Sequence, residues 1–448
     1  MKIHILSLGC ARTLVDSEGL GGILAQSGHA LTDQIRQAEC VVVNTCAFIQ
    51  EAEEESVNAI LEVAELKKKG KLRRLYVAGC LPQKRRNEKE DLLTLLPEVD
   101  GFIGTGDLPK LPQLIQERGA DRFFVTSPVP TLLFESKTPR YALTPKHFAY
   151  IKISEGCDHA CAFCSIPQYR GAHRSRPIED IVRQAEHLAA EGTVELNLIG
   201  QDSSYYGADI YGRPRLPDLL RAMGNVAGIR WIRILYAHPA HVNDELIRAI
   251  REVPNVAKYI DIPIQHINDE LLHKMRRETD GEYIRRLVDR FRGQIPGVAI
   301  RTTFIVGFPG ETEAHVDELA LFLQQARFER VGMFPYCPEP KTPAERMPDQ
   351  VPPDVRKARM ERLMLLQQGI SDEHNRKLLG SEIEVMIDEF PHDEPNLFMG
   401  RTYADAPEVD CQVYVNSSRA LKKGEFVQAR VTDTYEYDLV ADLVSSSG

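Results

Sequence analysis

The stretch from Ser154 to Pro167, SEGCDHACAFCSIP, places three cysteines within eight residues. Cys157 and Cys161 are separated by three residues, and Cys164 follows after two more. The preceding residues 149–153, AYIKI, are mostly apolar and predict a β-strand, so the cysteines are expected in the loop after it. Loops at the carboxyl ends of strands are where α/β proteins bind ligands. The stretch therefore predicts a ligand site within an α/β fold.

Two kinds of metal site fit a group of cysteine thiolates. Structural zinc prefers four ligands, usually in widely separated pairs, and His159 and His173 are near enough in the sequence to complete such a site. Iron–sulfur clusters are normally held by cysteine. A [4Fe–4S] cube with three cysteine ligands keeps one iron open, which a catalytic site needs and a structural site avoids. The spacing favours the iron–sulfur cluster, with zinc as the alternative.

Strand and helix patterns alternate about six times between Phe148 and Phe334. The expected strands read AYIKI, ELNLI, WIRIL, YIDI, AIRTTFIV and VGMF. Amphipathic helical patterns separate them, as in residues 177–190, where the apolar side chains share one face. This alternation predicts a partial (β/α)6 barrel or a doubly wound sheet over residues 143–375. In either fold the chemistry belongs on the loops that follow the strands.

The first 116 residues predict an N-terminal parallel α/β domain, because three apolar strand patterns alternate there with helical ones. Each strand pattern runs into a cysteine: Cys10 in LSLGC, Cys46 in VVNTC and Cys80 in YVAGC. The carboxyl ends of parallel strands meet at one edge of a sheet. We therefore expect these three thiols to share a second site. The alternative is three separately buried cysteines.

Residues 376–445 predict a small antiparallel β-barrel, because short alternating strands follow one another there. Residues 112–145, rich in Pro, Ser and Thr, are expected to connect the first two domains. From residue 376 onward the chain has seven basic and 14 acidic residues. A small barrel of this kind suggests RNA binding. The acidic balance argues against RNA and suits a basic protein partner.

The composition is that of an ordinary globular protein, with 43% hydrophobic and 27% charged residues and a formal net charge of −10. The sequence has no apolar run long enough to span a bilayer, and its N-terminus does not resemble a secretory signal. We therefore expect a cytoplasmic protein without membrane contact. Nine cysteines in that compartment predict metal or redox chemistry rather than a disulfide framework.

The C-x₃-C-x₂-C spacing after the first strand of a predicted barrel resembles the radical S-adenosylmethionine superfamily. The resemblance implies that Cys157, Cys161 and Cys164 hold a [4Fe–4S] cluster whose open iron binds S-adenosylmethionine. One electron from the cluster then cleaves the sulfonium to a 5′-deoxyadenosyl radical, which abstracts a hydrogen from carbon. The residues expected to bind this cofactor, from their positions at the strand ends, are Phe163, Gln201, Gln265, Gly307 and Phe308.

The cysteines in LGC, NTC and GC ahead of this barrel, with a small β domain after it, resemble the methylthiotransferases over essentially the whole chain. The resemblance implies that Cys10, Cys46 and Cys80 hold a second [4Fe–4S] cluster, which carries the sulfur that is methylated and inserted. It also implies that the terminal β domain is a TRAM domain. Two molecules of S-adenosylmethionine, a one-electron reductant and a sulfur donor are then required for each turnover.

Two branches of that family differ in their substrate. One branch methylthiolates adenosines in tRNA, and the RimO-type branch modifies the β-carbon of an aspartate in ribosomal small-subunit protein twelve. NTCAFIQEAEEES at 44–56, KISEGCDHACAFCSIPQYRG at 152–171 and DAPEVD at 405–410 resemble the second branch. The resemblance implies this ribosomal protein as the partner, either free or within the subunit, with no nucleic acid contact required. Methylthiolation of a tRNA adenosine is the alternative.

Several residues depart from the family pattern. The family usually shows Pro-Lys-Asn after the first cysteine, whereas this chain has Ala11, Arg12 and Thr13, which keeps only the positive charge. Cys337 and Lys341 stand where serine and glycine are expected. These departures bear on the fine positioning of the site. A non-catalytic iron–sulfur or zinc protein that binds ribosomes is a further alternative, and it predicts no cleavage of S-adenosylmethionine.

Overall fold

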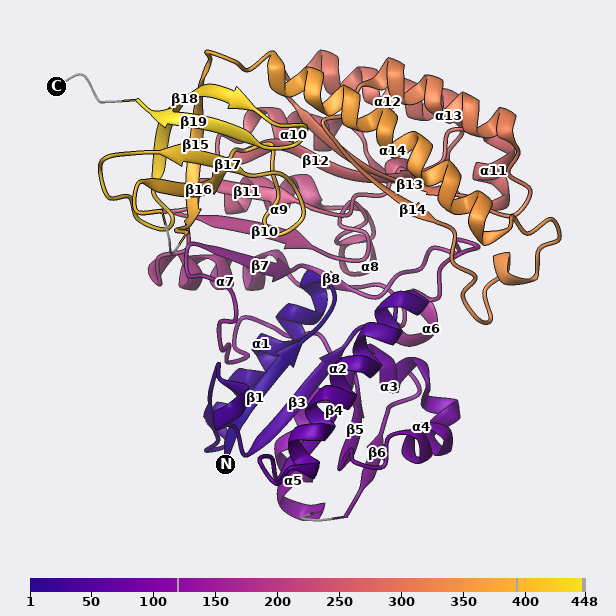
Figure 1. Ribbon diagram of the computed structural model, residues 1–448, viewed down its shortest axis with the longest axis vertical. Helices are drawn as coiled ribbons and strands as arrows, with labels where there is room; N and C mark the ends of the chain where they lie inside the picture. Colours follow the sequence, from indigo (N-terminus) through magenta and orange to yellow (C-terminus); the bar gives the residue numbers. More distant parts are fainter. Residues whose placement is uncertain (119–120, 392–393, 445–448) are drawn as a thin grey trace.

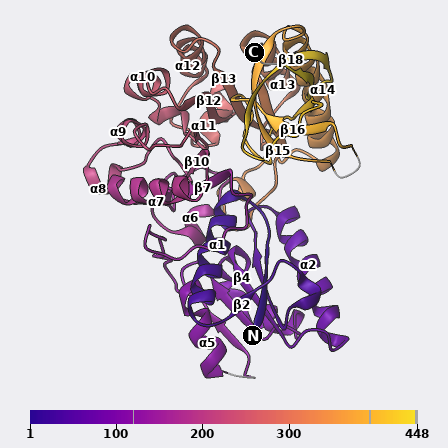
Figure 2. The ribbon, with the colours of Figure 1, turned by 90° about the vertical axis from the view of Figure 1, so that its left-hand side faces the viewer.

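Three bodies are visible in the computed structural model, which describes residues 1–118, 121–391 and 394–444 (Figure 1). An N-terminal α/β domain, drawn in indigo and violet, lies below an open barrel that runs from magenta to orange. A small yellow β-barrel lies beside the open barrel. Figure 2 shows the same three bodies from the side, with the N-terminal domain again below the other two. The predicted fold class is confirmed.

The N-terminal domain is built on a six-stranded parallel sheet with the order β2-β1-β3-β4-β5-β6. Its central strands are apolar on both faces because helices cover both sides, with α2 against one face and α1 and α5 against the other. The strands are β1 (Lys2–Ser7), β2 (Ala30–Leu31), β3 (Cys40–Thr45), β4 (Arg74–Gly79), β5 (Gly101–Gly104) and β6 (Phe123–Val125). The helices are α1 (Ala11–Gln26), α2 (Gln50–Lys68), α3 (Cys80–Lys84), α4 (Lys89–Leu95) and α5 (Leu111–Arg118).

The sheet of this domain extends beyond residue 116, because β6 pairs with β5. Helix α5 and strand β6 both fall within residues 112–145, where the sequence predicts only a connecting segment. Helix α5 escapes prediction because it has only eight residues and carries Pro112 in its first turn, where proline is tolerated. The connection proper begins after Val125.

The central domain is an open barrel of six parallel strands in the order β14-β13-β12-β11-β10-β7. This sequential order decides for the partial (β/α)6 barrel, because a doubly wound sheet would reverse its strand order at a switch point. The strands are β7 (Phe148–Lys152), β10 (Glu195–Ile199), β11 (Trp231–Ile234), β12 (Val256–Gln265), β13 (Ala299–Val306) and β14 (Arg330–Pro335). A short antiparallel pair, β8 (Ser154–Glu155) with β9 (Arg174–Ser175), brackets the cysteine loop.

Helices cover the outside of the open barrel, and their apolar faces form its largest hydrophobic core with the strands. They are α7 (Ile178–Ala190), α9 (Leu216–Met223), α10 (Asp244–Glu252), α11 (Asp269–Lys274), α12 (Gly281–Gln294), α13 (Glu313–Ala326) and α14 (Pro353–Arg376). Helix α6 (Ile166–Arg170) instead packs against the core of the N-terminal domain, and the short α8 (Ala208–Tyr211) has no buried residue. Helix α14 crosses the top of the molecule in Figure 1 and leads into the C-terminal domain.

The C-terminal domain is a closed five-stranded barrel in the order β15-β16-β17-β19-β18. Its strands are β15 (Glu382–Glu389), β16 (Leu397–Arg401), β17 (Val413–Asn416), β18 (Phe426–Thr434) and β19 (Leu439–Leu443). One pairing, β17 with β19, is parallel, and the others are antiparallel as the sequence predicts. The predicted end of the domain at residue 445 lies outside the described residues.

A segment of the C-terminal domain fills the amino-terminal end of the open barrel. This segment, residues 402–410, contains the DAPEVD stretch and is called the plug here. Asp405 lies 2.5 Å from the guanidinium of Arg330, and Asp410 lies 3.2 Å from that of Arg301. Both arginines come from barrel strands, so the two domains are joined by buried ion pairs. In the part of the chain that the structure describes, no helix has the length and apolar character needed to cross a bilayer.

Candidate active site at the mouth of the barrel

The first cysteine trio, Cys10, Cys46 and Cys80, follows the neighbouring parallel strands β1, β3 and β4. Gly9 adopts a left-handed φ of +90°, and a side chain there would begin 2.4 Å from Cβ of Cys46. The loops after β1 and β3 therefore touch, and only glycine permits this approach. The strand order places the three thiols at one edge of the sheet, as the sequence predicts.

The thiols of the first trio influence one another's ionisation. Burial and the neighbouring Cys80 and Cys10 thiols raise the pKa of Cys46 to about 12. Burial also opposes ionisation of Cys10, but the guanidinium groups of Arg12 and Arg170 outweigh it and lower its pKa to about 7. Arg170 donates a hydrogen bond to Sγ of Cys80 at 3.1 Å. Three crowded thiols beside fixed positive charge suit a metal centre that binds them as thiolates.

The second trio, Cys157, Cys161 and Cys164, lies in the loop between β8 and β9. The loop is held by its backbone: the N–H of Cys157 donates to the carbonyl of Gly171 at 3.0 Å, and that of Cys164 to Cys161 at 3.2 Å. Burial raises the pKa of both Cys157 and Cys164 to about 12, and the Cys161 thiol adds to the effect. The three thiols therefore lie close together and half-buried, and they face a cavity.

That cavity has a volume of about 580 Å³ and lies at the carboxyl ends of the barrel strands. Its size is in the range of pockets that bind cofactors. Of the residues that the sequence predicts at the cofactor site, six line it: Cys157, Cys161, Cys164, Phe163, Gln201 and Gln265. Gln265 ends β12 with a left-handed φ of 77°, which is uncommon for a residue other than glycine.

The other two predicted cofactor residues, Gly307 and Phe308, do not line this cavity in the structure. Gly307 lies under helix α14, and a side chain there would begin 2.2 Å from Cγ of Arg356. Phe308 is fully buried and packs edge-on against Tyr336, with 5.3 Å between the ring centroids. In this structure both support the wall of the site, and cofactor binding by them stays a prediction.

One wall of the cavity comes from the N-terminal domain, which the sequence reasoning did not foresee. Arg12, Phe48 and Ile49 line the cavity together with barrel residues. Arg12 and Phe48 each stand two residues after a cysteine of the first trio. The sequence signal that could have indicated this wall is the equal spacing of Arg12 from Cys10 and of Phe48 from Cys46. The loops that carry the first trio thus also enclose the space in front of the second.

Arg12 bridges the two domains at this wall. Its guanidinium donates to the carbonyl of Gly200, after β10, at 2.8 Å and lies 4.4 Å from the ring centroid of Tyr236. Its charge acts on both trios, because it lowers the pKa of Cys10 and opposes the burial that raises the pKa of Cys164. Arg12 therefore places a fixed cation between the two cysteine groups.

Known proteins resemble this chain in all three of its bodies. Residues 2–104 match Uncharacterized protein family UPF0004, residues 151–323 match the Radical SAM superfamily, and residues 379–444 match the TRAM domain. The ribosomal protein uS12 methylthiotransferase RimO of Anaeromyxobacter sp. (strain K) is 46% identical over 99% of this chain and 93% of its own length. The RimO of Clostridioides difficile (strain 630) is 41% identical over 99% of both chains.

The chain belongs to the RimO family of ribosomal protein uS12 methylthiotransferases.

Solved structures share the fold of this RimO-family chain at low sequence identity. The radical S-adenosylmethionine methyltransferase TsrM from Kitasatospora setae, with cobalamin and a [4Fe-4S] cluster bound, superposes with a TM-score of 0.56. It is 16% identical and covers 77% of this chain and 76% of its own. OxsB, a cobalamin-dependent S-adenosylmethionine radical enzyme, gives a TM-score of 0.50 at 13% identity, over 82% of this chain and 56% of its own. These likenesses show the shared fold alone.

A buried charge network joins the two trio-bearing domains of this RimO-family chain. Lys152 donates to Asp16 at 2.5 Å and to Glu155 at 2.6 Å. Arg170 donates to the same two carboxylates at 2.8 and 3.1 Å. All four side chains are at most 6% exposed, so two positive and two negative charges are buried together. Because Arg170 also reaches Cys80, the network fixes one domain against the other beside the first trio.

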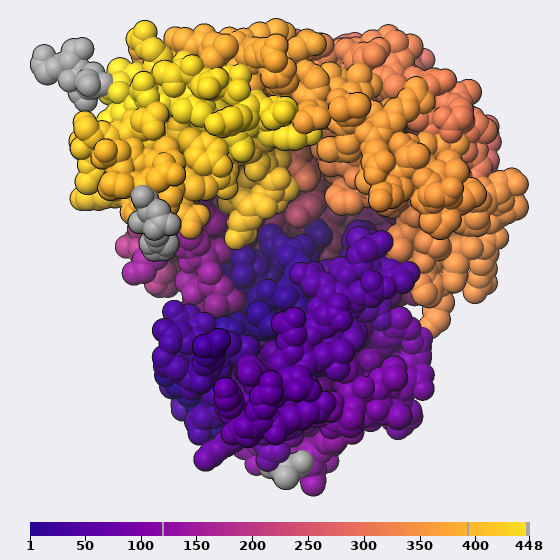
Figure 3. Space-filling model, viewed as in Figure 1, coloured from indigo at the N-terminus to yellow at the C-terminus, as the bar shows by residue number. Residues whose placement is uncertain are grey.

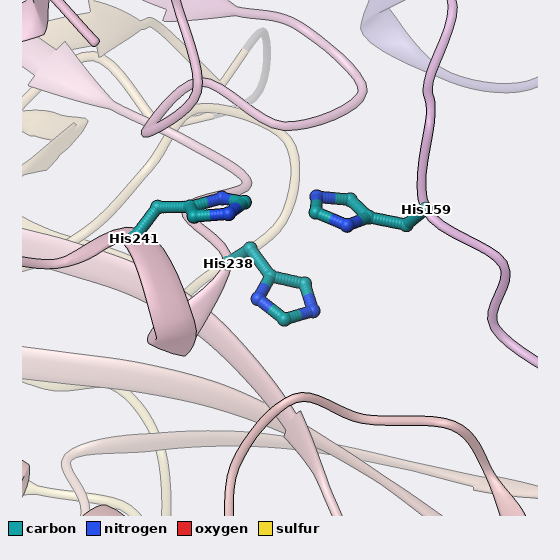
Figure 4. A group of neighbouring side chains, drawn as sticks. All are labelled: His159, His238 and His241. Atoms are coloured by element: carbon teal, nitrogen blue, oxygen red, sulfur yellow. The ribbon is translucent and has the colours of Figure 1, made fainter. Parts of the chain in front are cut away.

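Three histidines gather beside the cysteine loop (Figure 4), and two of them, His159 and His238, line the cavity. His159 comes from the cysteine loop, and His238 and His241 come from the turn after β11. His159 and His241 each donate to the same carboxylate oxygen of Asp202 at 2.8 Å. Burial lowers the pKa of His238 to about 2, with Arg277 adding to the effect, so this ring is neutral. Asp202 therefore ties the cysteine loop to the loops after two strands.

The two histidines nearest the second trio in the sequence both form hydrogen bonds through Nε2. His159 is engaged with Asp202, and His173 lies 3.0 Å from the hydroxyl of Ser175 through its Nε2 atom. These two histidines were the residues that the sequence offered as further zinc ligands. In the structure they serve to anchor the loop that carries the three cysteines.

Proposed function

We propose that this protein is a radical S-adenosylmethionine enzyme that replaces a hydrogen on the β-carbon of an aspartate of ribosomal protein uS12 with a methylthio group. The observation that carries the proposal is the position of the two cysteine trios, which come from two domains and lie on either side of the cavity wall formed by Arg12, Phe48 and Ile49. A reaction that makes a carbon radical and delivers sulfur to it requires two such centres close together.

The two trios are the proposed ligands of two [4Fe–4S] clusters. Cys157, Cys161 and Cys164 would hold one of them, and the half-buried thiols leave an open side toward the cavity. Cys10, Cys46 and Cys80 would hold the other. When bound, the first cluster with S-adenosylmethionine supplies a hydrogen-abstracting radical, and the second supplies sulfur. The donor set fits an iron–sulfur cluster at each trio, because each offers three cysteines, and bound metal would favour the thiolate forms of Cys46 and Cys157, whose pKa values are raised.

Other residues of the chain would position the cofactor and keep water away. The cavity lining is largely apolar, with Phe163, Ile305 and Pro335 among its residues. Such a lining protects a reactive radical from solvent and from side reactions. The amides of Gln201 and Gln265 face the same space and offer hydrogen-bond donors and acceptors to the cofactor. The cavity can hold one molecule of S-adenosylmethionine with the substrate side chain beside it.

The substrate would approach from the outside of this cavity. Figure 3 shows a recess where the N-terminal domain, the barrel and the C-terminal domain meet. Some acidic residues of the C-terminal domain are bound internally, as Asp405 and Asp410 are in the plug. Others, such as Asp433 and Glu436, are exposed and available to a basic protein. The proposed partner is uS12, free or in the ribosomal subunit, in the cytoplasm, and nucleic acid contact is not required.

The proposal also includes the limits of the three domains and two co-reactants. The proposed limits are 143–375 for the radical core and 376–445 for the TRAM domain, and the N-terminal methylthiotransferase domain, predicted over 1–116, extends to Val125 because β6 pairs with its sheet. A one-electron reductant and a sulfur donor complete the reaction.

The experiment that tests this function is an anaerobic reaction of the cluster-reconstituted enzyme with reductant, sulfide and S-adenosylmethionine. Purified uS12 and tRNA are both present, and mass spectrometry looks for a methylthio group in place of hydrogen. We expect it on one aspartate of uS12. A methylthio group on adenosine would keep the chemistry and overturn the substrate. Unmodified substrates without any 5′-deoxyadenosine would overturn the radical assignment and favour a non-catalytic metal protein.

A further inference from the structure

We propose that Arg12 binds the side-chain carboxylate of the substrate aspartate and so selects an acidic residue for modification. This inference rests on the proposed function and adds to it the group that recognises the reacting side chain. It starts from the position of Arg12, which comes from the sulfur-carrying domain but lines the cavity of the radical domain.

The reaction itself fixes where the substrate carboxylate must lie. The β-carbon of aspartate must reach both the radical made at the second trio and the sulfur held at the first. Its carboxylate is one bond from that carbon, so it also lies between the trios. Arg12 is the cation at that place, because it follows Cys10 by two residues, lines the same cavity as Cys164 and reaches the loop after β10. A carboxylate enclosed in an apolar cavity requires such a partner.

The guanidinium of Arg12 has capacity for a ligand. Within residues 1–118, 121–391 and 394–444, it makes a single hydrogen bond, to the carbonyl of Gly200. Its other N–H groups form no hydrogen bond within these residues, yet they are not fully enclosed by protein. They are therefore open to the cavity that Arg12 lines. The ring of Tyr236 supports one face of the guanidinium and leaves the planar edge free. Arginine binds a carboxylate through two parallel hydrogen bonds along such an edge.

Arg277 is the other arginine in the described lining of the cavity, and it is placed for a different task. Its guanidinium lies 3.4 Å from Sγ of Cys161 and donates to the carbonyl of Pro263 at 2.8 Å. It is therefore engaged with the second trio rather than with the space between the trios. Of the three acidic residues in the described lining, Asp202 binds two histidines and Glu339 binds Lys84, and the third, Glu51, forms no hydrogen bond or ion pair with Arg12.

The test measures binding of uS12 to the cluster-loaded enzyme without reductant, so that no turnover occurs. The enzymes are wild type, Arg12→Gln, Arg12→Lys and Arg86→Gln. The ligands are uS12 and a uS12 variant in which the aspartate marked by mass spectrometry is asparagine. Arg86 is the matched control, because it also links the N-terminal domain to the barrel, through the carbonyl of Gln168 at 2.9 Å, but does not line the cavity.

We expect Arg12→Gln to raise the Kd for uS12 about tenfold to a hundredfold, the usual worth of a charge-assisted hydrogen bond. The asparagine variant should bind to wild type and to Arg12→Gln within about twofold of each other, because the charge that Arg12 recognises is absent. The Kd of Arg12→Lys for uS12 should lie between those of wild type and Arg12→Gln, and the Kd of Arg86→Gln should equal that of wild type. Iron content is measured in all four enzymes so that affinities are compared at equal cluster loading, and the control Arg86→Gln should form 5′-deoxyadenosine without uS12 as wild type does.

An equal loss of affinity for both forms of uS12 would overturn the inference, because Arg12 would then act on the site as a whole. Unchanged affinity for both forms would overturn it as well. These results differ from a failure of the proposed function, in which the wild-type enzyme leaves every aspartate of uS12 unmodified. That failure would also remove the carboxylate ligand on which the inference depends.

Discussion

The two ends of the open barrel are built from the same strands and are used in opposite ways. Strand β13 shows this along its own length, because Arg301 near its start binds the plug, whereas Thr303 and Ile305 line the cavity. At the amino end every inward polar group of this strand is paired. At the carboxyl end the inward groups face an open space. The difference separates the part of the molecule that holds the fold from the part that does the chemistry.

The amino end is held by contacts between the barrel and the C-terminal domain. The hydroxyl of Tyr259 donates to Asp410 at 2.7 Å, and that of Tyr150 donates to the carbonyl of Pro407 at 3.2 Å. Burial raises the pKa of the Asp410 carboxyl, while Arg301 opposes this rise. The C-terminal domain is therefore fixed to the barrel and presents the same outer surface to any partner.

The carboxyl end is incomplete without the N-terminal domain. Arg12, Phe48 and Ile49 close the cavity, and the buried network of Lys152, Arg170, Asp16 and Glu155 fixes their domain in place. Substitutions at the two ends of the barrel should therefore have different effects. Those at the carboxyl end should reduce activity, and those at the amino end should reduce stability alone.

The largest effect is expected from the cysteines. Cys161→Ser should abolish both 5′-deoxyadenosine and methylthio product, because the radical-forming cluster loses a ligand. Cys46→Ser should abolish the methylthio product but keep 5′-deoxyadenosine formation, because only the sulfur site is lost. Chromatography of the nucleoside and mass spectrometry of uS12 measure the two products. If Cys46→Ser also stopped formation of 5′-deoxyadenosine, the two trios would not have separate tasks.

A large loss of stability with reduced activity is expected from Asp16→Asn. This change leaves Lys152 and Arg170 with one buried carboxylate instead of two, and removing one partner of a buried ion pair costs about 3 kcal/mol. The free energy of unfolding of the N-terminal domain, followed by hydrogen exchange, should fall by about that amount. The product of the reaction should decrease as well, because the cavity wall is no longer held. Unaltered exchange in α1 would contradict the role of the network.

A smaller loss, confined to stability, is expected from Asp410→Asn in the plug. The change weakens the bonds to Arg301 and Tyr259 and should cost about 2 kcal/mol. Arg301 retains Asp261 at 2.9 Å, which limits the loss. The denaturation midpoint should fall, and the turnover of the folded enzyme should equal that of wild type. A loss of turnover comparable to that of Asp16→Asn would show that the two ends are not independent.

How much of this could be read from the sequence differs between the two ends. The cysteine spacings and the strand ends predict both trios and the side of the barrel on which they lie. The DAPEVD stretch was noticed, but nothing local shows that Asp405 and Asp410 enter the barrel, because their arginine partners are 75 and 109 residues away. Arg12 was noticed for its charge alone. Its contact with Gly200 spans 188 residues and requires the docked domains to be seen.

The smallest effect is expected on the outer surface. Replacing the exposed Asp433 and Glu436 by asparagine and glutamine should slow association with the basic uS12 by a few-fold at low salt. The effect should vanish at high salt because exposed charges are screened. Stopped-flow mixing at two ionic strengths measures it. Faster association of the variant would contradict the proposed approach of uS12 along the C-terminal domain.

The most direct test of the central claim is an iron count supported by Mössbauer spectra. Three reconstituted proteins are compared: wild type, a variant with Cys10, Cys46 and Cys80 all changed to alanine, and one with Cys157, Cys161 and Cys164 all changed to alanine. We predict about eight irons per chain in wild type and about four in each variant, all in [4Fe–4S] clusters. About four irons in wild type, with one of the variants unaffected, would show that one trio holds no cluster and would contradict the claim.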